Sequence, residues 1–309
     1  MSVKPGPTGL IWMAMGAVVQ LAVMLGVLHF RTEQGPAEQL AGRARRLALV
    51  GQMRAALDSS AEAEKSAVMA TSDQDSRRFA AQSQSAAATL ERQHQELRGL
   101  LASGPKSETD RLEQFTLALA ALQRVDKEVL DLAVLNTNLK AARLDFGPAA
   151  AALKGMDAAL ARVAAAHGDD ASSQARRIIL LASDARIRAW RIQALLPPHI
   201  AEQSPRKMDE LEAAMAAEDR GVREDLESLA ALREAGGKPD LEAAASFYSR
   251  FSGVKARVLE LSRANTNVRS LAISLNQKRK ALSACQEALS ALEEAIAREP
   301  IAAVPVNPR

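Results

Sequence analysis

Between residues 37 and 298 the chain places apolar side chains at the three- and four-residue steps that are typical of amphipathic helices. Clusters of turn and N-cap residues, most of them with Gly or Pro, interrupt this pattern. The interruptions are Ser72–Asp75, Ser103–Ser107, Gly147–Pro148, Pro197–Pro205 and Gly236–Pro239. The pattern therefore predicts helices at 37–71, 75–103, 108–146, 149–196, 205–235 and 239–298, with His167–Asp170 as a candidate interruption of the fourth.

The N-terminal segment Gly9–Phe30 is different, because it is apolar on every face and has no formal charge. Its 22 residues span about 33 Å as a helix, which matches a hydrocarbon core of about 30 Å. The alternative is a cleaved signal peptide, but the apolar stretch is too long and no good cleavage site follows Phe30. We expect an uncleaved transmembrane helix at 9–30 after a short tail at 1–8. Its partner would be the lipid bilayer of the inner membrane.

The orientation of that helix is open at this point. Only Lys4 and the terminal amine precede it, whereas Arg31, Arg43, Arg45 and Arg46 follow it closely. The positive-inside rule alone would place the large domain in the cytoplasm, but the rule weakens when a long domain follows.

The composition favours an all-α fold. Aromatic residues make up only 3% of the chain, while the strong helix formers Ala, Leu, Glu, Arg and Gln dominate. The 40 basic and 37 acidic side chains are interspersed, whereas a nucleic-acid-binding protein concentrates its basic residues on one face or in one arm. We therefore expect no nucleic-acid partner. The single cysteine, Cys285, excludes an intrachain disulfide.

An internal repeat is the most informative feature. Val125–Lys140 (VDKEVLDLAVLNTNLK) aligns without a gap with Val254–Arg269 (VKARVLELSRANTNVR), at an offset of 129 residues. The order of helices and breaks upstream is also similar, with matching parts at 38–146 and 170–275. A period this long indicates a domain duplication rather than a solenoid. We predict repeats at 38–167 and 168–298 in an elongated antiparallel bundle, and a disordered tail at 299–309.

Within each repeat an Asn-Thr-Asn triplet lies on an apolar seam. The second seam continues from Val254 to Ile296 and predicts one unbroken helix from about 239 to 298. Asn136 and Asn265 then occupy matching core positions, where an amide needs hydrogen-bond partners. They could fix the register of the packed helices, as buried Asn does in coiled coils, and could face each other across a pseudo-twofold axis.

The alternative is a polar ligand pocket in the bundle core near Asn136, Asn138, Asn265 and Asn267. Asn138 and Asn267 lie two residues further on, about 200° round a continuous helix. On that geometry the two Asn of one triplet could not face the same small ligand, and Thr137 and Thr266 would flank the seam.

Other candidates are weaker. The four histidines have no metal-ligand spacing, and no nucleotide-binding or nucleophile motif is present, so we expect no catalytic residue, no metal and no cofactor. The densest basic stretch contains Arg186, Trp190 and Arg191. An arginine there could bind a carboxylate ligand in bidentate fashion, although most such arginines form surface ion pairs. Cys285 is either a small core residue or a link between two chains.

Two segments carry a family resemblance. RVLELSRANTNVRSLAISLNQKRKALSACQEALSALEEAI (Arg257–Ile296) resembles the last helix of the four-helix-bundle sensor domains of methyl-accepting chemotaxis receptors. MRAALDSSAEAEKSAVMATSDQDSRRFAAQ (Met53–Gln82) resembles their first helix and turn. The likeness covers most of residues 40–297, and the tandem arrangement is similar to the helical bimodular sensors. It implies a periplasmic domain, ligand binding between helices and dimerisation.

The sequence departs from that family in its signalling part. The second transmembrane helix, the linker and the methylated cytoplasmic coiled coil have no counterpart here, and no ligand-binding arginine motif matches. We therefore expect a sensor-like domain that binds a small ligand or a partner protein, signals through a partner and forms a homodimer. The alternative is a membrane-tethered coiled-coil scaffold without a small ligand, and a third hypothesis is a receptor fragment.

Overall fold

The computed structural model describes residues 36–102, 104–232 and 238–299. The expected transmembrane helix Gly9–Phe30, the tail at 1–8 and most of the tail at 299–309 lie outside these residues. Within the described ranges, no helix combines the length and the apolar character needed to cross a membrane.

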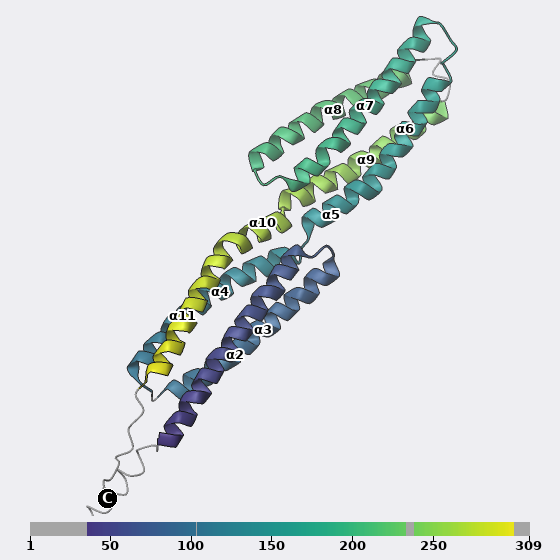
Figure 1. The fold of residues 1–309 in the computed structure, drawn as a ribbon. Coiled ribbons are helices and arrows are strands. Elements are labelled where there is room, and N and C mark those ends of the chain that lie inside the picture. Colours follow the sequence, from purple (N-terminus) through teal and green to yellow (C-terminus); the bar gives the residue numbers. More distant parts are fainter. Residues whose placement is uncertain (1–35, 103, 233–237, 300–309) are drawn as a thin grey trace, which may run out of the picture. The chain divides into compact units, whose positions relative to one another are not determined.

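The described part of the chain is all-α, as predicted (Figure 1). Its elements are α2 (Pro36–Met69), α3 (Asp73–Leu101), α4 (Lys106–Ala133), α5 (Thr137–Leu144), the π-helix η1 (Asp145–Ala149), α6 (Ala150–Ala165), α7 (Ser173–Ala201), α8 (Pro205–Ala231), α9 (Lys238–Ala264), α10 (Thr266–Ile273), the π-helix η2 (Ser274–Lys278) and α11 (Arg279–Arg298).

Several helix starts follow the N-cap signals in the sequence. The hydroxyl groups of Ser72, Ser172 and Ser204 each accept a hydrogen bond from a backbone N–H in the first turn of the following helix. The candidate interruption at His167–Asp170 is confirmed, since α6 ends at Ala165 and α7 begins at Ser173.

Four of the predictions about where helices end were wrong. The helices predicted at 108–146 and 239–298 both break, at Asn136 and Asn265. Gly147–Pro148 does not end a helix, because the wider turn of η1 carries Pro148 without a break between α5 and α6. α7 continues past Pro197 and Pro198 to Ala201, where the burial of His199 and Ile200 anchors its last turn.

The described elements repeat in the order that the sequence alignment suggested. α5 and α10 each have eight residues, and each is followed by a five-residue π-helix at an offset of 129 positions. The helices before them correspond in the same way, α2–α4 with α7–α9, and the helices after them are α6 and α11.

The chain divides into two compact units that do not coincide with the two repeats. The described residues of unit 1 lie within Met1–Ala55, Thr89–Thr116 and Gln286–Arg309. They come from α2, α3, α4 and α11, and Arg54 of α2 pairs with Glu293 of α11 at 2.7 Å. Its buried apolar side chains include Leu49, Val50, Met53, Leu90, Leu97, Leu101, Leu112, Phe115, Leu289, Leu292 and Ile296.

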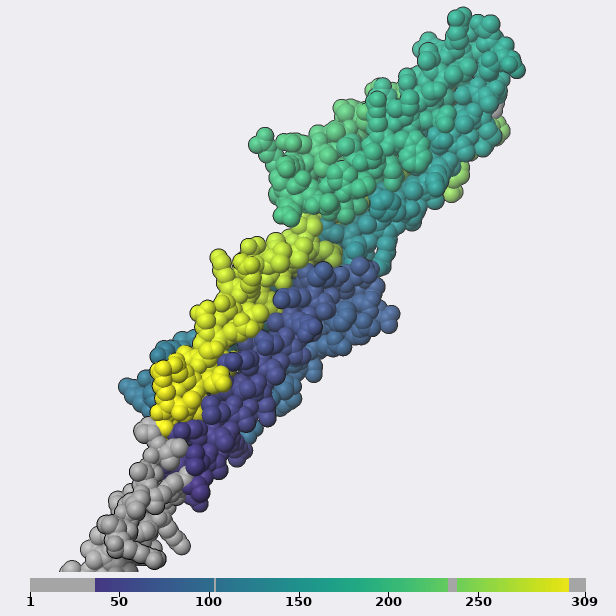
Figure 2. All heavy atoms as spheres, in the orientation of Figure 1, coloured from purple at the N-terminus to yellow at the C-terminus, as the bar shows by residue number. Residues whose placement is uncertain are grey.

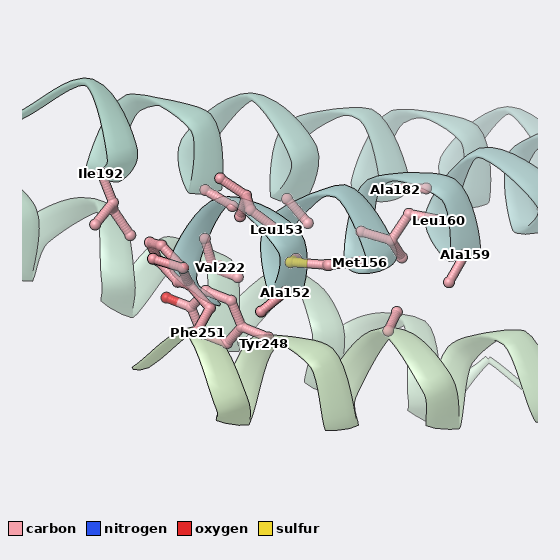
Figure 3. Packing of buried hydrophobic residues seen from close by; sticks show 14 of the residues in the cluster. Ala152, Leu153, Met156, Ala159, Leu160, Ala182, Ile192, Val222, Tyr248 and Phe251 are labelled. Atoms are coloured by element: carbon pink, nitrogen blue, oxygen red, sulfur yellow. The ribbon is translucent and has the colours of Figure 1, made fainter. Parts of the chain in front are cut away.

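Unit 2 comprises Ala56–Ala88 and Leu117–Cys285 and contains a complete four-helix bundle of α6, α7, α8 and α9, which we call the second bundle. Its core joins side chains of all four helices, among them Leu153, Ile192, Val222 and Phe251 (Figure 3). Side chains fill the space between its helices on the face that Figure 2 shows.

The two repeats exchange helices within unit 2. α6 is the last helix of the first repeat, yet it packs on α7 and α9 of the second. Conversely, Ile273 at the end of α10 packs against Val68 of α2 and Val129 of α4. Each repeat therefore completes a helical bundle that begins with the other repeat's helices.

Candidate functional site

The exchange takes place at the two Asn-Thr-Asn triplets, Asn136–Asn138 and Asn265–Asn267, which we call the Asn-Thr-Asn junction. Asn136 and Asn265 have left-handed backbone conformations, with φ of 50° and 53°. Asn adopts this conformation more readily than other non-glycine residues. One left-handed residue ends a helix, so the chain turns and starts again as α5 or α10. The seam pattern gave no sign of this break, because apolar positions continue on both sides of it.

The first turns of α5 and α10 cap each other. The backbone N–H of Thr137 donates to Oγ1 of Thr266 at 3.2 Å, and the N–H of Thr266 donates to Oγ1 of Thr137 at 3.0 Å. The N–H groups of Asn138 and Asn267 donate to each other's Oδ1, both at 3.1 Å. The first N–H groups of a helix have no partner inside the helix. Here side chains 129 residues away supply the acceptors, and neither N-cap asparagine makes a cap bond of its own.

The four asparagine side chains also pair across the junction. Nδ2 of Asn138 donates to Oδ1 of Asn265 at 2.7 Å, and Nδ2 of Asn267 donates to Oδ1 of Asn136 at 3.0 Å. The pairing is reciprocal, as a pseudo-twofold arrangement requires. All four amides lie together, so the expectation that the two Asn of one triplet could not face the same place was wrong. It assumed a continuous helix, which the left-handed residues interrupt.

The end of α7 closes one side of the junction. The carbonyl of Ile200 accepts from Nδ2 of Asn138 at 2.6 Å, and the carbonyl of Glu202 accepts from Nδ2 of Asn265 at 2.8 Å. The first repeat offers no equivalent partner for Asn136, whose Nδ2 is buried and has no hydrogen-bond partner among the described residues. The junction is therefore symmetric in its backbone and asymmetric in its outer contacts.

His199, which the sequence did not single out, holds that end of α7 to α9. Its Nδ1 lies 2.8 Å from Oγ of Ser262, whose hydroxyl donates to the His199 carbonyl at 2.9 Å. Its Nε2 lies 2.9 Å from Oε1 of Glu212, which also accepts from Arg263 at 2.7 Å. The Arg263 hydrogen bond lowers the pKa of Glu212. Ser262 is buried and its proton is engaged, so this Ser-His-Glu arrangement joins helices rather than exposing a nucleophile.

The π-helix η2, which follows α10, carries a buried charge. Lys278, which is 2% exposed, lies 2.9 Å from Glu64 and 2.8 Å from Asp126. Burial raises the pKa of Asp126, and the ammonium of Lys278 opposes that rise. Cys285 of the following helix, α11, is also buried, and burial raises the pKa of its thiol to about 12. Burial favours the interpretation of Cys285 as a core residue.

The two predicted arginines lie on α7 and pair with acidic residues of the second bundle. Arg186 makes a bidentate contact with Asp157 at 2.8 and 3.2 Å, and this pair lowers the Asp157 pKa. Arg191 lies 3.3 Å from Glu218. The structure therefore places Asn136 and Asn265 in one hydrogen-bonded cluster, through Asn267 and Asn138, but does not bond Arg186 or Arg191 to them.

A groove of about 520 Å³ lies between the segment η1–α6 and α9 of the second bundle. Its lining is apolar except for Arg250, whose guanidinium stacks 5.6 Å from the centre of the Phe247 ring. Phe247 reaches across to Gly155 of α6, where only a glycine leaves room for the ring. Within the described ranges, no cluster of three or more His, Cys, Asp or Glu side chains could hold a metal ion.

A comparison of the sequence with protein-family models and with curated proteins finds no match. The resemblance to chemoreceptor sensor domains therefore stays an interpretation of the sequence.

Proposed function

We propose that this protein is a sensor-like helical-bundle domain, anchored in the inner membrane by Gly9–Phe30, that binds a small ligand or a partner protein in signal transduction. The helical domain would lie in the periplasm. The observation that supports this proposal is the helix exchange at the Asn-Thr-Asn junction. Both chain paths between the second bundle and the α2–α4 helices, through α5 and through α10, meet there side by side.

The mechanism is a shift between packed helices. Two chain segments lead from the junction into the second bundle, α5–η1–α6 and α9–α10. The first turns of α5 and α10 cap each other at the junction. A ligand that binds one packing of α6 on α9 more tightly than another shifts the population toward it. Because the caps are reciprocal, one path cannot move without changing the hydrogen bonds of the other.

The groove between η1–α6 and α9 is where a small ligand would contact both paths. The π-helix η1, which supplies Pro148 to the groove, also joins α6 to the junction. Single π-turns inside α-helices are frequent at functional sites. Signalling would proceed through a homodimer or a partner protein.

The competing proposal is a membrane-tethered scaffold. It is favoured because the polar side chains of the predicted site already form hydrogen bonds or ion pairs within the chain. Asn138, Asn265 and Asn267 donate their amides to partners within the chain, and Arg186 and Arg191 pair with Asp157 and Glu218. In this case the asparagines only fix register.

A binding screen separates the two proposals. The full chain in lipid nanodiscs would be screened by thermal shift against amino acids, organic acids and amines, and a saturable stabilisation is expected for a sensor. Gly253→Leu, which fills the groove, should abolish it. Gly99→Leu on α3, where the space around the glycine is also open, should not. No stabilisation by any compound, with both variants folded, would support the scaffold.

The orientation needs a separate measurement. Protease added to spheroplasts should digest the helical domain if it lies in the periplasm. Protection until the membrane is lysed would place the domain in the cytoplasm and contradict the proposal.

A further inference from the structure

Asp145 is an acidic residue in an apolar environment. It is the first residue of η1 and is 0% exposed. One turn away on either side, Ala141 and Ala149 are fully buried, and they belong to the same core cluster as Ile192 and Leu196 of α7. An isolated carboxylate in such surroundings is strongly disfavoured unless it has a cation or several donors.

The hydrogen bonds around Asp145 leave two acceptors without a donor. Nε2 of Gln193 donates to Oδ1 and to the backbone carbonyl of Asp145, the latter at 3.2 Å, which uses both N–H groups of the amide. Oδ2 of Asp145 and Oε1 of Gln193 are buried, and neither has a hydrogen-bond partner among the described residues. The two unpaired oxygens therefore belong to the Asp145 carboxyl group and the Gln193 amide, which are already joined by a hydrogen bond.

Among the described residues, no cation compensates Asp145. Asp145 makes no ion pair with a Lys, Arg or His side chain within the described ranges, and its carboxylate accepts its hydrogen bond from the neutral amide of Gln193. The basic side chains of α5, α6, α7 and α9 that have printed partners bond elsewhere: Lys140 to the Leu135 carbonyl, Arg143 to the Thr71 carbonyl, Arg162 to Asp240, Arg186 to Asp157, Arg188 to Glu218 and Asp225, Arg191 to Glu218, His199 to Glu212, Lys255 to Asp219, Arg257 to Glu260 and Arg263 to Glu212. Arg250 of α9 lies over the Phe247 ring.

We propose that Asp145 and Gln193 form a proton-binding site, in which a proton on Oδ2 of Asp145 is donated to Oε1 of Gln193. The neutral acid and the amide then form a cyclic pair with two parallel hydrogen bonds. One proton satisfies both orphan oxygens and removes the buried charge. Burial raises the pKa of Asp145 to about 6, although the bond from Gln193 lowers it, which fits a proton held in the folded protein.

Release of this proton would act on η1. The carboxylate would face an amide oxygen with no donor between them, which weakens the contact of η1 with α7. Because η1 continues directly from α5, a change in the contact of η1 with α7 would also shift α5 at the Asn-Thr-Asn junction. The site would make the packing of the second bundle sensitive to pH near neutrality. It does not rest on the sensory function proposed above, since a scaffold could carry it equally well.

The test compares the full chain with Asp145→Asn over pH. The amide that this substitution introduces would keep the cyclic pair, because its Nδ2 can donate to Oε1 of Gln193 at every pH. We expect the folding equilibrium constant of the natural chain to fall about tenfold relative to Asp145→Asn between pH 5 and pH 7.5. The control, Asp184→Asn at a site on α7 away from η1, should show no such change. A constant difference between the natural chain and Asp145→Asn across this range would overturn the proposal.

A second measurement does not depend on the folding of that variant. In the natural chain with ¹³C-labelled aspartate, one carboxyl signal should titrate near pH 6, and this signal should move to a higher midpoint in Gln193→Glu, where two carboxyl groups share one proton. A midpoint near 4 for the signal that responds to Gln193→Glu would show an ordinary ionised aspartate and refute the site.

Discussion

Thr137 and Thr266 donate their backbone N–H groups to each other's Oγ1 atoms, at 3.2 and 3.0 Å, although they are 129 residues apart. Their hydroxyl oxygens lie 3.2 Å from each other. Each helix start therefore depends on a side chain of the other repeat. Four of the predictions below test this junction and the packing of the bundle that it connects; the other tests the buried charges of η2.

The first prediction concerns the reciprocal caps. Thr137→Val and Thr266→Val keep the side-chain shape and remove one acceptor each, so each should lower the free energy of unfolding by about 1–2 kcal/mol. The double variant should lose less than the sum, because either single variant already removes the hydrogen bond between the two hydroxyl groups. Urea denaturation measures all three. Thr109→Val at an exposed site is the control, and additive losses would contradict coupling.

The second prediction separates the two left-handed asparagines. Asn136→Ala and Asn265→Ala lose the same backbone preference and the same type of Oδ1 contact. Asn265 in addition donates to the Glu202 carbonyl, whereas Nδ2 of Asn136 has no partner among the described residues. Asn265→Ala should therefore be more destabilising by about 1 kcal/mol in thermal or urea unfolding. Equal losses would show that the contact with the end of α7 contributes nothing.

A third prediction tests the buried charges of η2. Lys278→Met leaves Glu64 and Asp126 without their cation and should destabilise the protein by about 3 kcal/mol at neutral pH. Lys278→Met combined with Glu64→Gln and Asp126→Asn should recover most of that loss, because neither partner of Lys278 then carries a charge. If the triple variant is as unstable as Lys278→Met alone, the ion pairs are not the cause.

The fourth prediction is a pH dependence in the second bundle. Burial raises the pKa of Asp219, but hydrogen bonds led by those from Lys255 and Tyr248 outweigh it and lower the pKa to about 2. The unfolded value is about 3.9, so the folded state favours the carboxylate. Asp219 therefore contributes about 2 kcal/mol of stability above pH 4, which is lost as the pH falls toward 2. Asp219→Asn should cost this amount at pH 7 and almost nothing at pH 2. A loss that does not vary with pH would contradict the assignment.

The fifth prediction concerns the close approach of α6 and α9. A Cβ on Gly155 would lie 2.5 Å from the Phe247 ring, so Gly155→Ala should destabilise the protein by about 1–2 kcal/mol. Gly99→Ala in open space should instead be neutral or slightly stabilising, because alanine favours a helix. Adding Phe247→Leu to Gly155→Ala should restore part of the loss in calorimetry. No restoration would mean that the ring is not the obstacle.

Much of the local structure could be read from the sequence. The three- and four-residue periodicity predicted the helices, and the serine N-caps and the interruption near His167 marked several of their ends. Gly147–Pro148 misled this reading, because a π-turn carries a proline that an α-helix would not. The aligned triplets also pointed to residues that bond to each other, although Asn136 pairs with Asn267 and Asn265 pairs with Asn138 rather than Asn136 with Asn265.

The sequence by itself determined the all-α class, the repeat at 129 positions and the burial of Asn136 and Asn265, because these follow from local propensity and periodicity. Only the tertiary structure decided that the triplets break their helices, that α6 and α10 pack with the other repeat, and that Asp145 meets Gln193 in an apolar core. The physical reason is that a left-handed asparagine and a buried acid are both unfavourable alone. They are stable here through partners that lie 48 to 131 residues away, and no pattern along the chain records such partners.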